Sequence, residues 1–232
     1  MTTKKRISKH EMKEDQFVTG MFKLEEWAEA NLKTIIIAVG AVIIVGVAIW
    51  VYIAQSGSAE DKAFDILGRA EVEMRTNQTQ LAITDYEEVL NKYGSTPAAS
   101  QAAFKLANLL FQSNDFVKAE QAFRTYADKY ATDDTFRHSA KRGIAASLAG
   151  QARHQEAAAA FLETAKADTA AVTYEEDLFD ALESAVKAGD QTLAREAFAL
   201  LEKRGSSSER YRSAKITLIE KGILTYDQGE FK

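Results

Sequence analysis

The strongest feature of the hydrophobic pattern is an uninterrupted apolar stretch near the N-terminus. The twenty residues from Ile35 to Ala54 contain no charged side chain. A helix of that length rises about 30 Å, the thickness of the hydrocarbon core of a bilayer. The stretch is apolar on every helical face, so it predicts a transmembrane helix over residues 34–54. The residues expected at the two membrane interfaces, aromatic rings and a lysine, are Trp27, Lys33, Trp50 and Tyr52.

The segment just ahead of this stretch, residues 21–33, has an amphipathic pattern. Met21, Leu24 and Trp27 share one helical face, and most of the charged residues lie elsewhere. This arrangement favours an amphipathic juxtamembrane helix along the membrane surface. A second interpretation, that the transmembrane helix simply continues through this segment, fits the sequence equally well. Residues 1–20 form a basic tail, and residues 55–61 form a short linker to the rest of the chain.

The distribution of basic residues predicts the orientation in the membrane. Seven lysines and arginines precede the apolar stretch, whereas only three occur between residues 55 and 75. The positive-inside rule then places the N-terminus in the cytoplasm and the C-terminal domain outside it. In a bacterium with two membranes, this means an inner-membrane protein with a periplasmic domain. A cleavable signal peptide is the alternative, but six acidic residues precede the apolar stretch, and that stretch exceeds the usual length of about 7 to 15 residues.

Beyond residue 61 the pattern becomes that of amphipathic helices in a repeat. An alanine followed four residues later by an aromatic residue recurs at Ala82, Ala119, Ala157 and Ala194, so the period is 37, 38 and 37 residues. Twelve residues before each alanine stands a small or apolar residue, and turn residues lie between the two. Each unit is therefore expected to be a pair of helices that approach closely at the small residues. Stacked pairs bury their remaining apolar faces against each other and form a solenoid with a concave face.

The amino-acid composition supports an all-α chain and argues against several classes of function. Only one proline, Pro97, occurs, and strong helix formers dominate beyond residue 60. There is no cysteine, which excludes disulfides and thiolate chemistry. The net charge of -5 argues against binding of nucleic acid, because neutralising phosphates needs a basic surface.

The repeat resembles the tetratricopeptide repeat, with small residues facing each other across a helical hairpin and an aromatic residue one turn further on. The resemblance covers residues 62–232 as four repeats and a partial fifth, in which Gly222 takes the small position and residues 228–231 the turn. Because the fifth unit lacks a second helix, either the natural chain is longer or a partner covers this end. Carrying over the groove positions of the family implies a partner-binding groove lined by Phe64, Leu67, Phe104, Phe111, Arg142, Phe179 and Val186. An alternative is that several of these residues only pack the core.

No pattern in the sequence indicates catalysis, a cofactor or a metal site. The three histidines, His10, His138 and His154, have no ligand spacing and are interpreted as solvent-facing. Phosphate-binding glycine loops and nucleophile elbows are also missing. Acidic neighbours such as Glu175-Glu176-Asp177 are interpreted as solvated helix surface, and Lys141-Arg142 as a surface pair. We therefore expect a non-enzymatic protein.

The overall layout adds a second resemblance. The segment LEEWAEANLKTIIIAVGAVII and the repeats behind it resemble single-pass tetratricopeptide-repeat ancillary subunits of the bacterial Sec translocon. That resemblance implies a link between the translocon and periplasmic chaperones, with membrane protein subunits and periplasmic proteins or peptides as partners. Two other interpretations remain open: a structural accessory subunit of another membrane complex, and a coordinator of envelope assembly.

Overall fold

The computed structural model describes residues 21–22, 27 and 29–225, and all regular elements in those residues are helices. The chain divides into two units, Met1–Ser58 and Ala59–Lys232. The all-α class predicted from the sequence is confirmed. The predicted tail, residues 1–20, lies outside the described residues, as does part of the predicted juxtamembrane helix at residues 21–33.

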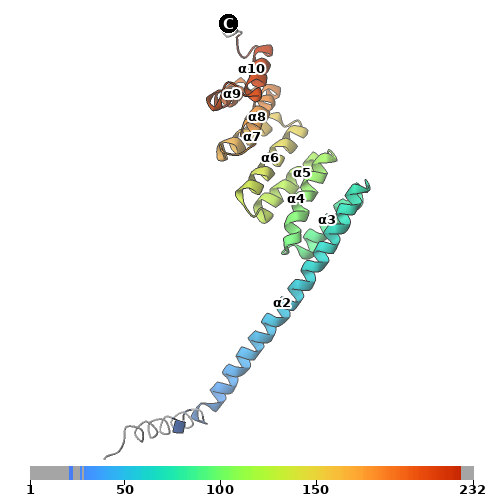
Figure 1. The fold of residues 1–232 in the computed structure, drawn as a ribbon, viewed down its shortest axis with the longest axis vertical. Helices are drawn as coiled ribbons and strands as arrows, with labels where there is room; N and C mark the ends of the chain where they lie inside the picture. The colour runs from blue at the N-terminus through green and yellow to red at the C-terminus, as the bar shows by residue number, and fades with distance from the viewer. Residues whose placement is uncertain (1–20, 23–26, 28, 226–232) are drawn as a thin grey trace, which may run out of the picture. The chain divides into compact units, whose positions relative to one another are not determined.

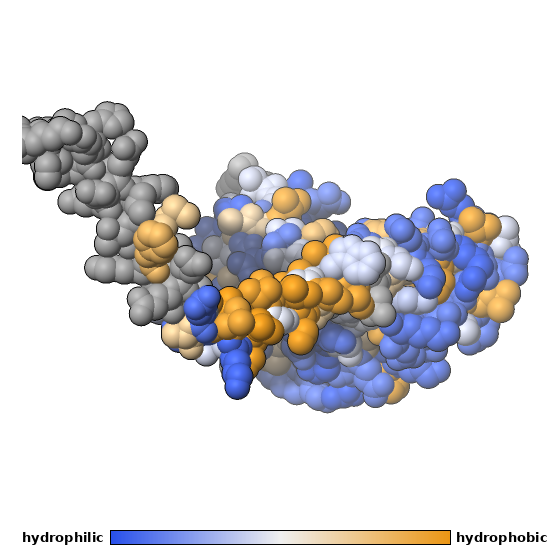
Figure 2. Space-filling model, turned by 90° about the horizontal axis from the view of Figure 1, so that it is seen from below, coloured by the Kyte–Doolittle hydropathy of each residue, from blue (hydrophilic) through white to orange (hydrophobic). Residues whose placement is uncertain are grey.

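The first unit is dominated by the N-terminal part of helix α2, which runs from Leu32 to Arg75. The stretch Leu32–Val51 is long and apolar enough to cross a membrane, with a mean hydropathy of 2.8 and none of it buried. Figure 2 shows hydrophobic residues gathered in a continuous exposed run. Trp27 and Trp50, both expected at membrane interfaces, are 58% and 69% exposed. The side chain of Tyr52 lies outside the described residues.

Residues 55–61, where the sequence predicts a linker, are helical instead and continue α2. The physical reason is that a single Gly57 between two serines costs a helix only about 1 kcal/mol. Ending a helix would also expose carbonyl groups that the continuing helix satisfies internally. A short Ser-Gly segment between two strongly helical sequences is therefore a weak breaker.

The second unit is a series of helices, each packed on the next (Figure 1). The last part of α2 begins it, and the remaining helices are α3 (Thr79–Tyr93), α4 (Pro97–Gln112), α5 (Phe116–Thr125), the π-helix η1 (Tyr126–Tyr130), α6 (Asp134–Gly150), α7 (His154–Ala167), α8 (Tyr174–Ala188), α9 (Gln191–Arg204) and α10 (Glu209–Glu220). The hairpins α2/α3, α4/α5, α6/α7 and α8/α9 correspond to the four predicted repeats. Helix α10 is the first helix of a fifth.

The small residues lie where the repeat pattern requires them. All eight paired positions have no exposed surface: Ala70 with Ala82, Ala107 with Ala119, Ala145 with Ala157, and Leu182 with Ala194. The aromatic residues that follow, Tyr86, Phe123, Phe161 and Phe198, are also buried. Two core clusters result, one from Ala63 to Ala140 and one from Ala145 to Ile223, and both include residues of α6. The predicted repeat framework is therefore confirmed.

The turns inside the hairpins repeat as closely as the helices do. Each contains one residue with a left-handed backbone: Asn77, Asn114, Ala152 and Gly189, with φ of 59°, 61°, 59° and 77°. Asparagine and glycine tolerate this conformation, whereas alanine does so at a cost of about 1–2 kcal/mol. In the second and fourth turns, the next residue caps the following helix, as Asp115 and Asp190 accept hydrogen bonds from backbone N–H groups.

The C-terminal end differs from the prediction at one position. Gly222 is expected to be the small residue at a helix crossing, but α10 ends at Glu220 and Gly222 follows it with φ of 67°. A glycine shortly after a helix, in this left-handed conformation, ends the helix because it lets the chain turn away. Residues 226–232, including the predicted turn at 228–231, lie outside the described residues.

Candidate interaction groove

First helices of the repeats supply most of the lining of two cavities in the second unit. One of them, of about 750 Å³ and here named the aromatic pocket, lies among α2, α3, α4, η1 and the start of α6. Its apolar wall comes from Met74, Tyr86, Phe104, Tyr126 and Phe136. The aromatic pocket is therefore a largely apolar depression in the surface formed mainly by the first helices of the repeats.

Phe104 is the centre of the aromatic wall. Its ring lies 5.0 Å from that of Tyr126 and 6.4 Å from those of Phe123 and Phe136, the last two in edge-on geometry. Such offset and edge-on pairs are the favoured arrangements of aromatic rings. Phe136 is 45% exposed, so the wall is open to an incoming side chain.

Tyr126 is brought to this wall by the π-helix. The five residues Tyr126–Tyr130 continue α5 with wider hydrogen bonding, and Ala131 N–H donates to the carbonyl oxygen of Tyr126. Ser100 of α4, the first helix of the same hairpin, donates a hydrogen bond from its Oγ to the carbonyl oxygen of Tyr130 at 3.0 Å. Single-turn π segments are often found at functional sites. Here one adds a buried tyrosine to the floor of the pocket.

A second cavity of about 350 Å³ adjoins the first and is lined mainly by α4 and α6, with residues from α5, α7 and α8. The two share Phe104 and Asn108. Asn108 Nδ2 donates to the carbonyl oxygen of Phe104 at 2.8 Å, which fixes the orientation of the amide. The two cavities together form a groove along the first helices of the repeats.

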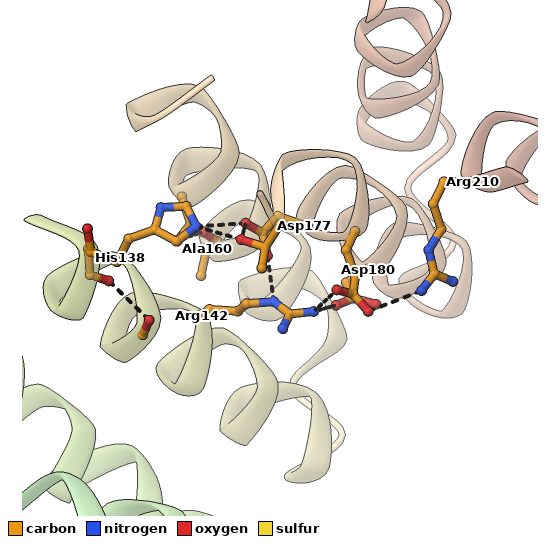
Figure 3. A network of polar contacts seen from close by, with 11 residues as sticks. His138, Arg142, Ala160, Asp177, Asp180 and Arg210 are labelled. Carbon is orange, nitrogen blue, oxygen red and sulfur yellow. Dashed lines mark hydrogen bonds and ion pairs between the residues drawn. The ribbon is translucent and has the colours of Figure 1, made fainter. Parts of the chain in front are cut away.

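A buried polar network borders the second cavity (Figure 3). Asp177 of α8 is fully buried and accepts hydrogen bonds from Arg142 Nε at 2.6 Å, His138 Nε2 at 2.9 Å and Thr173 Oγ1 at 3.0 Å. Arg142 also reaches Asp180 at 3.2 Å and Glu176 at 3.3 Å. The acids around Arg142 raise its pKa against the opposing effect of burial. Burial, together with neighbouring acids, raises the pKa of Asp180.

The network does not have the geometry of a catalytic relay. In a nucleophile–histidine–acid triad the two partners of the imidazole use different ring nitrogens. Here Thr173 and Asp177 both contact Nε2 of His138. The network therefore cross-links α6 to α8 and rigidifies the wall of the groove. Among the described residues, no group of three or more His, Asp or Glu side chains is placed to hold a metal ion.

A second acid, Glu120, joins the α5 helix to the turn between α6 and α7. It is largely buried and accepts hydrogen bonds from Arg124, Gln151 and Arg153 at 2.8–2.9 Å. Burial raises the pKa of Glu120, but the hydrogen bonds from Gln151 and Arg124 and the charge of Arg153 outweigh it, and the pKa is lowered. The charge-assisted hydrogen bonds of Glu120 therefore connect the second repeat to the third.

The repeat geometry agrees with a comparison against protein families, in which the tetratricopeptide repeat-like domain matches residues 25–220. The chain belongs to the tetratricopeptide repeat-like domain family. The match begins ahead of the apolar stretch, so the family pattern includes that stretch along with the repeats. A comparison with curated protein sequences finds no match.

The structure divides the seven groove positions expected for a tetratricopeptide repeat-like chain. Phe104, Phe111 and Arg142 line the groove, and the two phenylalanines also pack against the first core cluster. Leu67 is 3% exposed and belongs to the core, as the alternative interpretation holds. Phe179 and Val186 are partly buried against the second core cluster. Phe64 is 39% exposed and lies outside the lining of both cavities.

Two interpretations of polar residues are corrected. His138 was expected to face solvent, but its side chain is only 10% exposed, and His154 is half-buried at the start of α7. Asp177 was expected on a solvated face and is fully buried, while Arg142 is bonded to it rather than forming a surface pair with Lys141. The reason is that residues 35 to 39 positions apart meet across neighbouring repeats. The repeat period of 37 or 38 residues is the only signal in the sequence that could have paired them.

The sequence also missed several lining residues of the aromatic pocket. Met74, Arg75 and Phe136 were not among the expected groove positions, although all three line it. Met74 and Arg75 lie in the last turn of α2, and Phe136 lies in the first turn of α6. Met74 precedes Phe111 by one repeat period of 37 residues, so the repeat pattern could have found it, whereas no repeat equivalent among the expected groove positions points to Arg75 or Phe136.

Proposed function

We propose that this chain is a non-enzymatic interaction subunit, anchored in a membrane by residues 34–54, that binds a segment of a partner protein in the groove. The observation that carries the proposal is the open aromatic pocket around Phe104, built from the first helices of consecutive repeats. Helical solenoids use such surfaces for extended or helical peptides. The exposed ring of Phe136, beside the partly buried ring of Phe104, supports a role of this wall in binding.

The anchor is supported by the exposed apolar helix. From Ile36 to Ile53 its large apolar side chains are 40–72% exposed, an arrangement that is stable in lipid and costly in water. The excess of basic residues ahead of the helix favours a cytoplasmic N-terminus and a repeat domain on the other side, in the periplasm of a bacterium with two membranes. The signal-peptide alternative predicts a mature chain that begins after the apolar stretch, so N-terminal sequencing of the mature protein separates the two.

The resemblance to ancillary subunits of the Sec translocon suggests the partner complex. In this proposal the apolar helix lies beside the channel, and the repeats hold a periplasmic chaperone or a peptide near the exit. A structural accessory role in another membrane complex is the second candidate, because the same apolar helix and repeats would serve it. Envelope-assembly coordination is the third.

Site-specific photocrosslinking in cells tests the groove and the partner together. A photoreactive phenylalanine derivative replaces Gln101, an exposed residue of α4 that lines the aromatic pocket. The matched control replaces Gln121, an exposed glutamine of α5 that lines neither cavity of the groove. We expect a defined adduct from position 101 and none from position 121, with the adduct identified by mass spectrometry.

The adducts distinguish the candidates. Translocon subunits or their chaperones at position 101 support the first proposal. A single adduct with a different, stoichiometric membrane complex would refute the Sec assignment and support an accessory subunit. Equal adducts from both positions would show that the groove is not the binding surface.

A further inference from the structure

The charges of the aromatic pocket do not cancel. Its charged lining residues are Glu71, Arg75 and Lys105. Glu71 and Lys105 neutralise each other in an ion pair of 3.1 Å between α2 and α4. Arg75 remains, so the pocket carries a net charge of one positive unit, although the whole chain carries -5.

Arg75 is available to a ligand. It lies in the last turn of α2, is exposed, and forms no ion pair with the described residues. The C-terminal end of a helix carries about half a negative unit of charge, which offsets only part of the guanidinium charge. A positive group beside an apolar wall favours a ligand that pairs an apolar side chain with an anion.

The shape of the groove favours binding of an internal segment of a partner protein over binding of a chain terminus. The aromatic pocket continues past Phe104 and Asn108 into the second cavity. In the second cavity Arg142 is bonded to Asp177 and Asp180, so its charge is already compensated. A ligand anion is therefore favoured at the Arg75 end only.

We infer that the groove takes an internal segment of a partner protein, with an apolar side chain against Phe104 and an aspartate or glutamate side chain beside Arg75. This inference rests on the proposed function and specifies the chemistry of the partner. The apolar residue supplies most of the affinity by burial against the aromatic wall. The acidic residue supplies orientation, because only one direction of the segment brings it to Arg75.

Matched synthetic peptides test the inference with the full chain in nanodiscs of zwitterionic lipid. Each amidated Gly-Ser peptide carries one leucine and, two residues away, glutamate, glutamine or lysine. Fluorescence anisotropy measures the dissociation constants at low salt. We expect the glutamate peptide to bind about threefold more tightly than the glutamine peptide, as one partly exposed ion pair allows. The lysine peptide should bind more weakly than the glutamine peptide.

Substitutions in the chain then reverse the preference. Arg75→Glu should favour the lysine peptide over the glutamate peptide, and raised salt should shrink both differences. Lys203→Glu is the matched control, because Lys203 is an exposed basic residue in the last turn of α9, away from the groove lining. Lys203→Glu changes the net charge of the chain by the same amount as Arg75→Glu, and it should leave the order of the three peptide affinities unchanged.

The outcomes separate this inference from the proposed function. Equal binding of the three peptides, lost in Phe104→Ala, overturns the acidic preference and leaves a binding groove. Absence of binding by all three peptides overturns the inference, whereas the proposed function is decided by the photocrosslinks at position 101. A free C-terminal carboxylate that binds more tightly than the internal glutamate would also overturn it, because the ligand would then be a chain end.

Discussion

Removal of the Asp177 carboxylate should be among the most destabilising single changes in the repeat domain. In Asp177→Ala, Arg142, His138 and Thr173 lose their common acceptor, which is fully buried between α6 and α8. The main cost is that Arg142, whose side chain is only 30% exposed, loses its shortest partner at 2.6 Å. Breaking a buried ion pair by removing one member costs about 3–5 kcal/mol.

The surroundings of Arg142 place the effect at the lower end of that range. The guanidinium group keeps Asp180 at 3.2 Å and Glu176 at 3.3 Å, both partly exposed. We therefore expect a loss of about 3 kcal/mol in the free energy of unfolding. Urea titration of the full chain in mild detergent, followed by circular dichroism of the helices, measures this loss as a lower midpoint.

The matched control is Asp180→Ala, which removes a carboxylate from the same arginine at a site 32% exposed. It should cost less than about 1 kcal/mol, as partly exposed pairs do. The double variant with Arg142→Ala should be more stable than the sum of the single changes predicts, since the two groups are coupled. An Asp177→Ala chain no less stable than Asp180→Ala would refute the reasoning that burial makes this contact strong.

Three further changes test the packing, a turn and the charge network. Gly143→Ala should lower the free energy of unfolding by about 1–3 kcal/mol, since the added methyl would lie 2.6 Å from the ring of Phe123. In the control Gly68→Ala the added methyl meets no atom within 4 Å, so the free energy of unfolding should rise by up to about 1 kcal/mol. Ala152→Gly should raise the thermal midpoint, with a gain of about 0.5–1 kcal/mol, because φ of 59° suits glycine; an unchanged or lower midpoint would contradict this. Glu120→Gln should lower the thermal midpoint at pH 7, because the folded pKa of Glu120 lies below its ordinary 4.5, so its stabilising contribution is fully present above 4.5. The difference from the unchanged chain should shrink as pH falls through the folded pKa. A difference that stays the same from pH 7 down to the lowest pH at which the chain remains folded would show that shape rather than charge is responsible.

The groove was predictable only in part, and the reason differs between residues. Phe104 and Phe111 both lie in α4, seven residues apart, and each follows an apolar residue of the preceding repeat, Leu67 or Met74, by 37 residues. Leu67 obeys the same period but is 3% exposed, because the sequence records helical phase without recording the depth of packing. Whether an apolar residue faces a groove or the core depends on the distance between two neighbouring helices, which no single helix determines.

The sequence by itself determined the helical class, the apolar stretch and the repeat framework. These follow from local periodicity, since helix amphipathicity and the spacing of small residues are properties of short segments. Ala70 and Ala82, for example, are fully buried as that spacing predicts.

Only the tertiary structure decided the burial of Asp177 and the position of Arg75 beside an aromatic wall, whereas the helical course of residues 55–61 follows from a Ser-Gly segment too short to break a helix. The burial of Asp177 and the position of Arg75 depend on groups that are distant in sequence. The bonds of Asp177 to His138 and Arg142 join residues 39 and 35 positions apart, so they exist only once the third and fourth repeats have stacked.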